Sequence, residues 1–421
     1  MKRMSVEELI AQGPAQAAEM PKVVQENVKK IISNIRNRGD EALQEYRTMF
    51  DPNSVEEWER MEIPKEQWHQ ALEALPKTLR EALEGMAKRV RAFAEKQREA
   101  FRSFEMEIEP GVICGQRVQP IESVGCYVPA GRHPLPSTAM MTAIPAKVAG
   151  VKKVVIASPN PSPEILAVAA LAEADVVLAI GGAHGIAAMA FGTEQVPRVD
   201  LICGPGGVYV TEAKQQLSGI VGIDLPAGPT EVLVLAGEDA HADWVMADLL
   251  AQAEHDTAAR PLLGTTSEAL AQAIEAKVAA GFGGHPNQEA IEASIAANGV
   301  ICVCDTREQL ADIANAIAPE HLSIHVENPR ELLKDISHFG AAFLGESAAE
   351  VFGDYGVGPN HVLPTGGASR FTAGLSVSHF LRLQTTIEMS PDAAKRLAEP
   401  TAAVARAEGL ESHAQAALCR G

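Results

Sequence analysis

Short β-branched segments alternate with alanine-rich segments from about residue 110 onward, and this alternation limits the possible folds more than any other feature of the chain. The segments typical of buried strands are residues 154–157, 176–180 and 199–203, and those typical of helices are residues 165–173 and 184–191. Strands and helices that alternate in this way build a mostly parallel sheet with helices packed on its faces. The sequence therefore predicts an α/β fold.

A second series of the same kind begins at residue 231 and predicts a second α/β unit. Its expected strands are residues 231–235, 300–304 and 322–326, and its expected helices are residues 241–256 and 307–318. The segments before and after the two series have a helical pattern. We therefore expect two Rossmann-like α/β domains with helical N- and C-terminal extensions. The predicted boundaries are residues 1–108 for a helical N-terminal arm, 109–229 and 230–370 for the two domains, and 371–421 for a helical tail that docks on a partner subunit or on its own core.

The composition argues against several classes of protein. Hydrophobic residues make up 46% and charged residues 22% of the chain, as in an ordinary globular protein. The formal net charge of −19 disfavours nucleic acid and anionic lipid as partners. The best candidate for a membrane span, residues 166–183, contains Glu173 and Asp175, so we expect no membrane-spanning helix. The six cysteines are scattered, which is typical of reduced thiols, and we expect a cytoplasmic protein.

Gln252 and His255 are a candidate pair of metal ligands. They are three residues apart in a predicted helix, so both side chains leave the same face. An amide oxygen and an imidazole nitrogen together suit a borderline cation such as zinc. Two ligands do not complete a site, however, and a glutamine and a histidine exposed on a helix surface would show the same spacing.

Glu320 and His321 follow a proline that ends one predicted helix, and they directly precede a predicted strand. Loops at strand boundaries often hold catalytic residues in α/β folds. A histidine can transfer a proton near neutral pH, and an adjacent glutamate can act as a second base. The alternative is an exposed pair of polar residues in a turn.

Residues 350–361 combine polar side chains with several glycines and a proline. These glycines and the proline disfavour a regular element, so Asp354 and His361 are expected in a long loop. A loop of this kind is costly to order, which favours a function over an ordinary turn.

Three further segments give weaker signals. Residues 181–185 and 204–207 are glycine-rich turns after predicted strands, where free backbone N–H groups could face a phosphate. Neither matches the G-x-G-x-x-G dinucleotide fingerprint, and both are equally consistent with tight turns between a strand and a helix. Residues 408–413, which include Glu408 and His413, have the pattern of an ordinary surface helix.

Taken together and in this order, the motifs resemble the histidinol dehydrogenase family from about residue 35 to residue 420. The matching segments are Asn37–Leu43, Gly125–Gly131, Ile144–Val151, Asp224–Glu231, Gln252 with His255, Pro319–Leu322 and Asn360–Thr365. The resemblance implies a domain-swapped homodimer with two Rossmann-like domains and one zinc ion per subunit. It also implies the NAD-linked oxidation of an amino alcohol to the acid in two hydride-transfer steps. The default substrate is therefore L-histidinol.

The resemblance further implies roles for individual residues. The implied zinc ligands are Gln252, His255, Asp354 and, reached from the partner subunit, His413. The implied catalytic pair is Glu320 and His321: His321 takes the alcohol proton while hydride leaves for NAD, and Glu320 then activates water on the bound aldehyde. The implied substrate contacts are the four zinc ligands together with Thr230, Glu350, His361 and Glu408. The implied NAD contacts are Tyr127, His184 and Gly207.

The chain departs from the family pattern at positions that contact the cofactor and the substrate. The family usually has glutamine at the position of His184 and asparagine at that of Gly207, so two implied NAD contacts are altered. It usually has serine at the position of Thr230, and threonine keeps the side-chain hydroxyl. Arg132 lies in a loop that also departs from the pattern, and it would fit the sulfonate of a sulfopropanediol. The open alternatives are a homologue that oxidises such a hydroxymethyl compound, a zinc hydrolase and a non-catalytic zinc-binding dimer.

Overall fold

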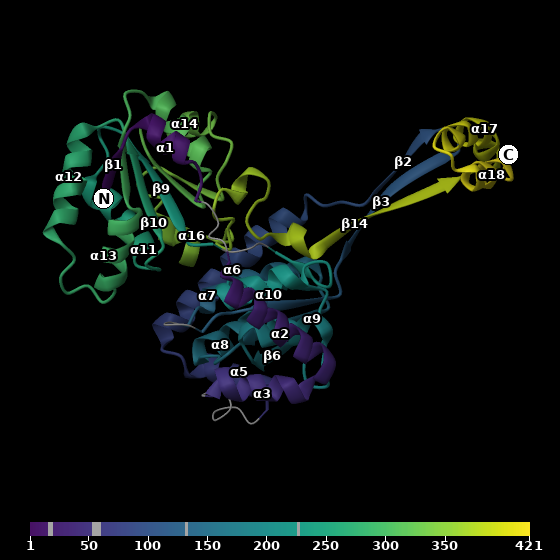
Figure 1. Ribbon diagram of the computed structural model, residues 1–421, viewed down its shortest axis with the longest axis horizontal. Coiled ribbons are helices and arrows are strands. Elements are labelled where there is room, and N and C mark those ends of the chain that lie inside the picture. The colour runs from purple at the N-terminus through teal and green to yellow at the C-terminus, as the bar shows by residue number, and fades with distance from the viewer. Residues whose placement is uncertain (16–19, 53–59, 131–133, 225–227) are drawn as a thin grey trace.

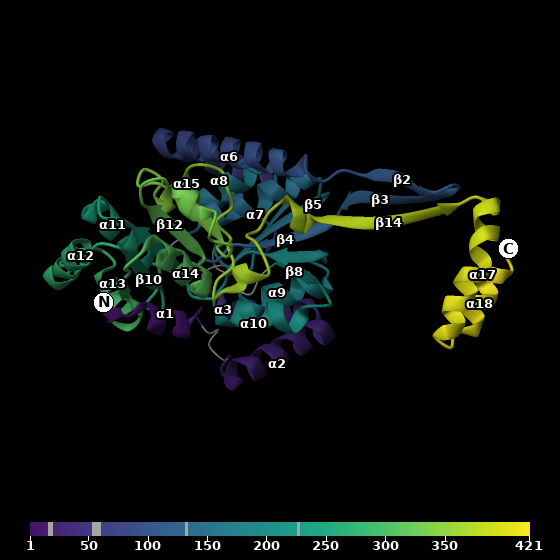
Figure 2. The same ribbon diagram turned by 90° about the horizontal axis from the view of Figure 1, so that it is seen from above.

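The structure is a computed structural model that describes residues 1–15, 20–52, 60–130, 134–224 and 228–421. Two α/β domains lie side by side, which confirms the expected fold, and a long antiparallel ribbon extends from them to a pair of helices (Figure 1 and Figure 2). The C-terminus lies at the far end of this ribbon, and the N-terminus lies in the other, more distant domain (Figure 1). None of the helices described is long and apolar enough to cross a membrane.

The first domain contains a parallel sheet with the strand order β6-β5-β4-β7-β8. The strands are β4 (Ser123–Tyr127), β5 (Lys153–Ser158), β6 (Val176–Ala179), β7 (Leu201–Cys203) and β8 (Gly222–Ile223). One face is covered by α5 (Lys65–Ala74), α6 (Lys77–Arg98), α7 (Pro136–Ala149) and α8 (Pro163–Leu171). The other face is covered by α2 (Lys22–Arg38), α3 (Asp40–Phe50), α9 (Gly182–Phe191) and α10 (Val208–Leu217). Burial on both faces explains the continuous apolar sequences of these strands.

The second domain is built in the same way around a parallel sheet with the strand order β1-β11-β10-β9-β12-β13. The strands are β1 (Lys2–Met4), β9 (Glu231–Ala236), β10 (Arg260–Thr265), β11 (Val300–Val303), β12 (His321–His325) and β13 (Ala341–Leu344). One face packs against α1 (Val6–Gln12), α14 (Arg307–Ile317) and α15 (Pro329–Leu333). The other face packs against α11 (Ala242–Ala253), α12 (Glu268–Ala280) and α13 (Gln288–Asn298). Each domain therefore has its own hydrophobic core on each face of its sheet.

The ribbon is an antiparallel sheet with the strand order β14-β3-β2. Its strands are β2 (Phe104–Glu109), β3 (Val112–Pro120) and β14 (Leu381–Met389). The ribbon ends at α17 (Pro391–Ala407) and α18 (Glu411–Leu418), which pack on each other away from both domains (Figure 2). Large apolar side chains are exposed along the ribbon, namely Phe104, Met106, Ile108, Leu383 and Ile387.

The structure differs from the predicted domain boundaries in two places. Residues 1–108 do not form a separate arm, because β1 pairs with β11 in the second domain while α2, α3, α5 and α6 cover the first. Residues 371–421 are not wholly helical, because β14 pairs along its full length with β3. Helical periodicity reports which face of a helix is buried, and it does not report which sheet buries that face. Helical periodicity therefore indicated helices in these segments, but it indicated neither the strands β1 and β14 nor the domain on which each helix packs.

Candidate active site

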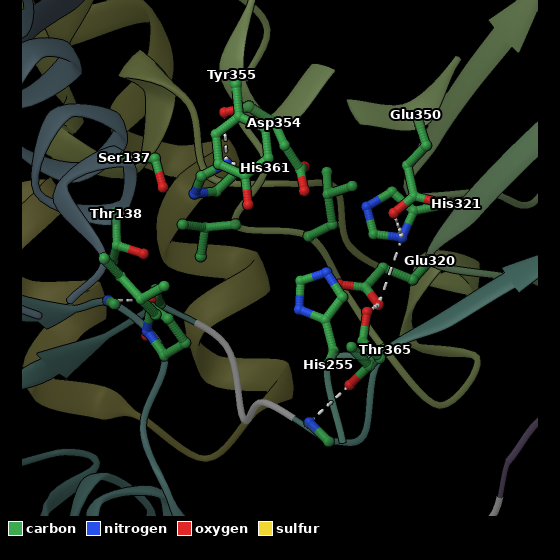
Figure 3. Close-up of a pocket in the computed structure, with 18 residues that line it drawn as sticks. Ser137, Thr138, His255, Glu320, His321, Glu350, Asp354, Tyr355, His361 and Thr365 are labelled. Atoms are coloured by element: carbon green, nitrogen blue, oxygen red, sulfur yellow. Dashed lines mark hydrogen bonds and ion pairs between the residues drawn. The ribbon is translucent and has the colours of Figure 1, made fainter. Parts of the chain in front are cut away.

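A cavity of about 240 Å³ lies between the two domains and contains most of the polar residues singled out in the sequence (Figure 3). Its lining includes Leu135, Ser137, Thr138, Gly204, Pro205 and Asp224 of the first domain, and Thr230, His255, Glu320, His321, Glu350, Asp354, Tyr355, His361 and Thr365 from the second domain and the segments that follow it. The first domain contributes the segments after β4 and β7, where the strand order reverses. Ligands of open α/β sheets bind in the crevice at this point, so the cavity is the candidate active site.

Glu320 and His321 are positioned by the end of α14 and the start of β12. Ala318 follows α14 in the left-handed conformation, at φ 52°, and turns the chain toward the strand. Oε2 of Glu320 accepts hydrogen bonds from the Thr230 hydroxyl at 2.6 Å and from the Glu231 backbone N–H at 3.0 Å. Nδ1 of His321 lies 3.2 Å from the carbonyl oxygen of Glu231. The backbone of residue 231 therefore aligns both side chains.

The contact between His321 and the Glu231 carbonyl decides where the ring carries its proton. A carbonyl oxygen can only accept, so a neutral ring carries its proton on Nδ1 and leaves Nε2 unprotonated. This Nε2 is buried and has no hydrogen-bond partner among the described residues. Burial lowers the pKa of His321 to about 4, so the ring is neutral at pH 7. A neutral imidazole with a free nitrogen is suited to accept a proton from an alcohol.

Two buried carboxyl groups lie close to this ring. Nδ1 of His321 is 3.6 Å from Oε2 of Glu320 and 3.7 Å from Oε1 of Glu350. Burial raises the pKa of Glu320 to about 8 and raises the pKa of Glu350 well above its usual range, and the Asp354 carboxylate adds to both shifts. The hydrogen bonds that Glu320 accepts act in the opposite direction and lower its pKa. Because His321 is neutral, these contacts are not ion pairs at pH 7.

Asp354 and His361 come from α16 (Glu350–Tyr355) and the segment that follows it. Residues 350–355 are therefore a short helix, whereas the sequence predicted an irregular loop. Nδ1 of His361 lies 3.1 Å from the carbonyl oxygen of Asp354 and 3.7 Å from its Oδ1. Asn360 donates from Nδ2 to the carbonyl oxygen of Met141 in α7 at 2.7 Å, which fastens this segment to the first domain.

Gln252, His255 and Asp354 supply the donors that a zinc site would use in this chain. Nε2 of Gln252 donates to the Thr230 hydroxyl at 2.7 Å, while its Oε1 is buried with no hydrogen-bond partner among the described residues. A buried amide oxygen normally has a partner, so this oxygen indicates a position for a ligand. His255 and Asp354 line the same cavity (Figure 3). An amide oxygen, an imidazole nitrogen and a carboxylate oxygen fit a zinc ion.

Glu408 and His413 lie away from this cavity within the same chain. Glu408 follows α17 and His413 lies in α18, at the far end of the ribbon, where both line a separate hollow. Within the described part of the chain, no group of three or more histidine, cysteine, aspartate or glutamate side chains could hold a metal ion. The expected fourth ligand, His413 of the partner subunit, stays a prediction.

Tyr127, His184 and Gly207, the expected NAD contacts, all belong to the first domain. His184 lines a second hollow of about 550 Å³ together with Asn27, Lys30, Ile31, Tyr46, Phe50, Gly182, Ala183 and Tyr209. Nε2 of His184 lies 3.0 Å from Oδ2 of Asp51, so this nitrogen already has a partner. Gly207 has φ −66°, and a Cβ atom added there would have no described atom within 4 Å. An asparagine at residue 207 would therefore fit.

Tyr127 lies between the two hollows and contacts one lining residue of each. The Tyr127 hydroxyl accepts the backbone N–H of Gly182, at the larger hollow, at 3.2 Å. Gly204, at φ 110°, lies so close on the other side that a Cβ there would be 2.1 Å from the Tyr127 carbonyl oxygen. Gly204 in turn lines the cavity that holds His321. Tyr127 therefore contacts residues that line each of the two hollows.

Sequence reasoning missed Asp51, Ser137 and Thr138. Asp51 carries no motif, and only the fold brings it to His184. Ser137 and Thr138 follow β4, a strand that the sequence analysis did not predict, and Pro136 before them is a signal for the start of a helix. Arg132 and residues 225–227 lie outside the described residues, so the expected sulfonate contact of Arg132 stays a prediction.

The fold and the site define a two-domain α/β protein with a polar cavity at the domain boundary. The histidinol dehydrogenase family model matches residues 15–421. Histidinol dehydrogenase from Parasynechococcus marenigrum is 46% identical over 402 residues, which cover 94% of this chain and 90% of that protein. The Thermus thermophilus protein of the same name is 42% identical over 412 residues, which cover 98% of each chain. The crystal structure of histidinol dehydrogenase from Elizabethkingia anophelis superposes with a TM-score of 0.89 at 32% identity, over 100% of this chain and 98% of that chain. The chain therefore belongs to the histidinol dehydrogenase family and is an oxidoreductase.

Proposed function

We propose that the chain catalyses the zinc-dependent, NAD-linked oxidation of L-histidinol to L-histidine through a bound aldehyde. One observation carries this proposal: the partnerless Nε2 of His321 and the carboxyl of Glu320 lie at a cavity that His255 and Asp354 also line, and the partnerless amide oxygen of Gln252 is buried next to Thr230 of that cavity. The first pair provides acid–base chemistry, and the amide oxygen provides a metal ligand. Membership of the family supports the same function.

His321 is the proposed base for both oxidation steps. Its Nε2 accepts the proton of the alcohol hydroxyl, and later that of the aldehyde hydrate, as hydride leaves the same carbon. NAD supplies the hydride acceptor in each step. Because Nδ1 is held by the Glu231 carbonyl, the ring presents Nε2 to the substrate without first changing its tautomer.

Glu320 is the proposed base for the hydration of the aldehyde. Its carboxylate removes a proton from the water that adds to the carbonyl carbon. With a pKa of about 8, Glu320 is mostly protonated at pH 7, so the fraction able to act as a base grows as the pH rises. The buried cavity keeps the reactive aldehyde away from solvent between the two steps.

Zinc would be held by Gln252, His255, Asp354 and His413 of the partner subunit, and it would supply a positive charge that orients the substrate. Glu350, His361 and Thr230 line the same cavity and would contact the substrate, together with Glu408 of the partner subunit. We also propose NAD contacts at Tyr127, His184 and Gly207. The aromatic lining of the larger hollow, which includes His184, supports these contacts, because it suits a flat base.

We further propose that the protein is a homodimer in which the tail helices of one subunit complete the site of the other. Two features support a swapped tail. Glu408 and His413 lie far from the cavity of their own chain, and the ribbon that carries them exposes large apolar side chains to solvent. A chain that stayed monomeric would leave this apolar surface uncovered.

The test is NADH formation by the purified protein with L-histidinol and with a sulfopropanediol. The assay is repeated after a chelator has removed bound metal and again after zinc has been added back. We expect NADH with L-histidinol, loss of the activity on chelation and recovery with zinc. NADH formed only with the sulfopropanediol would assign the homologue with a shifted substrate, and NADH formed with neither alcohol would contradict both named substrates.

A further inference from the structure

The first-domain wall of the active-site cavity carries two hydroxyl groups that have no role in the proposed chemistry. Ser137 and Thr138, in the first turn of α7, are 6% and 3% exposed and line the cavity. Figure 3 shows them on the wall across from Glu320 and His321, with both hydroxyl oxygens directed into the cavity. No described residue forms a hydrogen bond with either hydroxyl. Both hydroxyls face the cavity and have no partner in the protein, so a ligand in the cavity can supply one.

The N-terminus of α7 adds positive potential at the same place. The helix has 14 residues and begins at Pro136, which has no N–H group. Its aligned peptide dipoles leave a partial positive charge at this end. The wall formed by Leu135, Ser137 and Thr138 carries no acidic side chain. Two hydrogen-bond donors in a positive environment favour an anion.

The acidic residues of the cavity do not oppose an anion on this wall. Glu320 and Glu350 lie on the opposite side of the cavity, and Asp354 lies between them and Ser137, next to His361 (Figure 3). Asp224 comes from the first domain, but its carboxylate is paired with the Lys214 ammonium and accepts the Gly204 N–H at 2.7 Å. Glu320 and Glu350 therefore lie across the cavity from α7, Asp224 is compensated by Lys214, and the zinc ion that Asp354 is proposed to bind would offset the charge of Asp354.

The position of α7 in the sheet indicates what kind of anion this would be. The helix follows β4, next to the point where the strand order reverses between β4 and β7. Dinucleotide-binding sheets hold a diphosphate at the N-terminus of the helix that follows this strand. A hydride acceptor also has to approach the substrate from the wall that faces the base.

We propose that Ser137 and Thr138 form an oxyanion subsite in which both hydroxyls donate hydrogen bonds to a phosphate or a sulfonate group. A phosphate would belong to the diphosphate of a dinucleotide, and a sulfonate would belong to an alcohol substrate. Both groups present tetrahedral oxygens with a negative charge. The identity of the ligand rests on the proposed function, whereas the subsite itself rests on the geometry of α7.

The test compares the variants Ser137→Ala and Thr138→Val, alone and combined, with Thr142→Val. Thr142 is the matched control, because it is buried in the same helix but donates its hydroxyl to the carbonyl oxygens of Thr138 and Ala139 at 2.8 and 3.2 Å. Binding of NADH is measured by fluorescence titration without any alcohol present. ADP-ribose, adenosine and ethanesulfonate are titrated as competing ligands. Thermal unfolding of each variant checks that it folds.

For a cofactor phosphate, we expect the double variant to bind NADH and ADP-ribose roughly 10- to 100-fold more weakly, as for the loss of two hydrogen bonds to a charged group. Adenosine binding and the Thr142→Val control should not change. For a substrate sulfonate, NADH binding should stay constant while ethanesulfonate binding falls. If every affinity of the double variant stays within about twofold of wild type, a difference too small for one such hydrogen bond, the subsite does not exist.

The same experiment separates failure of this inference from failure of the proposed function. A wild-type protein that oxidises no alcohol contradicts the proposed function, but its affinity for ADP-ribose and ethanesulfonate still tests the subsite. If the wild-type protein oxidises L-histidinol and the double variant binds NADH, ADP-ribose and ethanesulfonate with unchanged affinity, the subsite alone is refuted.

Discussion

Replacement of Thr230 by valine would test how the cavity positions its acid–base residues. The Thr230 hydroxyl donates to Oε2 of Glu320 at 2.6 Å and accepts from Nε2 of Gln252 at 2.7 Å. Valine keeps the shape but not the hydroxyl. The carboxylate form of Glu320 then loses one of its two hydrogen bonds, and the amide of Gln252 loses the partner that orients it.

The expected effect follows from the strength of the lost hydrogen bond. A hydrogen bond to a charged group contributes about 1.5–3 kcal/mol, which corresponds to a fall in kcat/KM of roughly 10- to 150-fold. The same hydrogen bond lowers the pKa of Glu320, so its removal raises that pKa above the present value of about 8. Because Glu320 acts as a carboxylate, the activity of the variant should need a higher pH than that of wild type.

The assay is the pH dependence of kcat/KM for oxidation of the aldehyde, which includes the hydration step assigned to Glu320 and omits the oxidation of the alcohol. Thr230→Ser is the control, because serine keeps the hydroxyl and should retain both the rate and the pH profile. If Thr230→Val shows the wild-type rate and the wild-type pH profile, the hydrogen bond does not position Glu320 for catalysis, and the reasoning is refuted.

Three further predictions concern other residues of the site. His321→Asn should abolish oxidation of the aldehyde and nearly abolish oxidation of the alcohol in stopped-flow measurements, and unchanged turnover would remove His321 from the mechanism. Gly207→Asn should leave thermal stability unchanged, since a Cβ there meets no described atom, and should strengthen NADH binding in titrations; weaker binding would mean that the loop holds the cofactor differently. Arg260→Met removes the ion pair of 2.8 Å between Arg260 and the buried Glu231 carboxylate. The free energy of unfolding, measured with denaturant, should fall by about 3–5 kcal/mol. A fall below about 1 kcal/mol would show that other groups compensate the charge of Glu231.

The local sequence pattern predicted the strands and helices whose own residues are mostly apolar and buried. Residues 154–157 and 176–180 are apolar throughout because their strands are covered on both faces, and they correspond to β5 and β6. Strands that depend on distant partners were not predicted. β14 is largely exposed and mixes apolar with polar side chains, and it exists as a strand because it pairs with β3. β1 contains only Lys2–Met4, which is too short to show a pattern.

In the candidate site, too, the sequence indicated single segments but not the contacts between segments that are far apart in the chain. The spacing of Gln252 and His255 predicted both on one helix face, whereas α11 ends at Ala253 and His255 lies in the turn that follows. The proline before Glu320 marked the turn into β12. Neither signal shows that these segments and Asp354 line one cavity, because that depends on how the strands are ordered in the sheet. The pairing of His184 with Asp51 also depends on tertiary structure, since the two residues are far apart in the sequence. The family pattern alone did not indicate it.

The most direct test of the proposed function is the ratio of NADH formed to L-histidinol consumed by the purified zinc-loaded protein, with a carbonyl-trapping reagent present. If His321 and Glu320 act on a retained aldehyde in one cavity, two NADH molecules and one L-histidine form for each L-histidinol, and no aldehyde is trapped. One NADH per L-histidinol with trapped aldehyde, or no NADH at all, would contradict the proposed function.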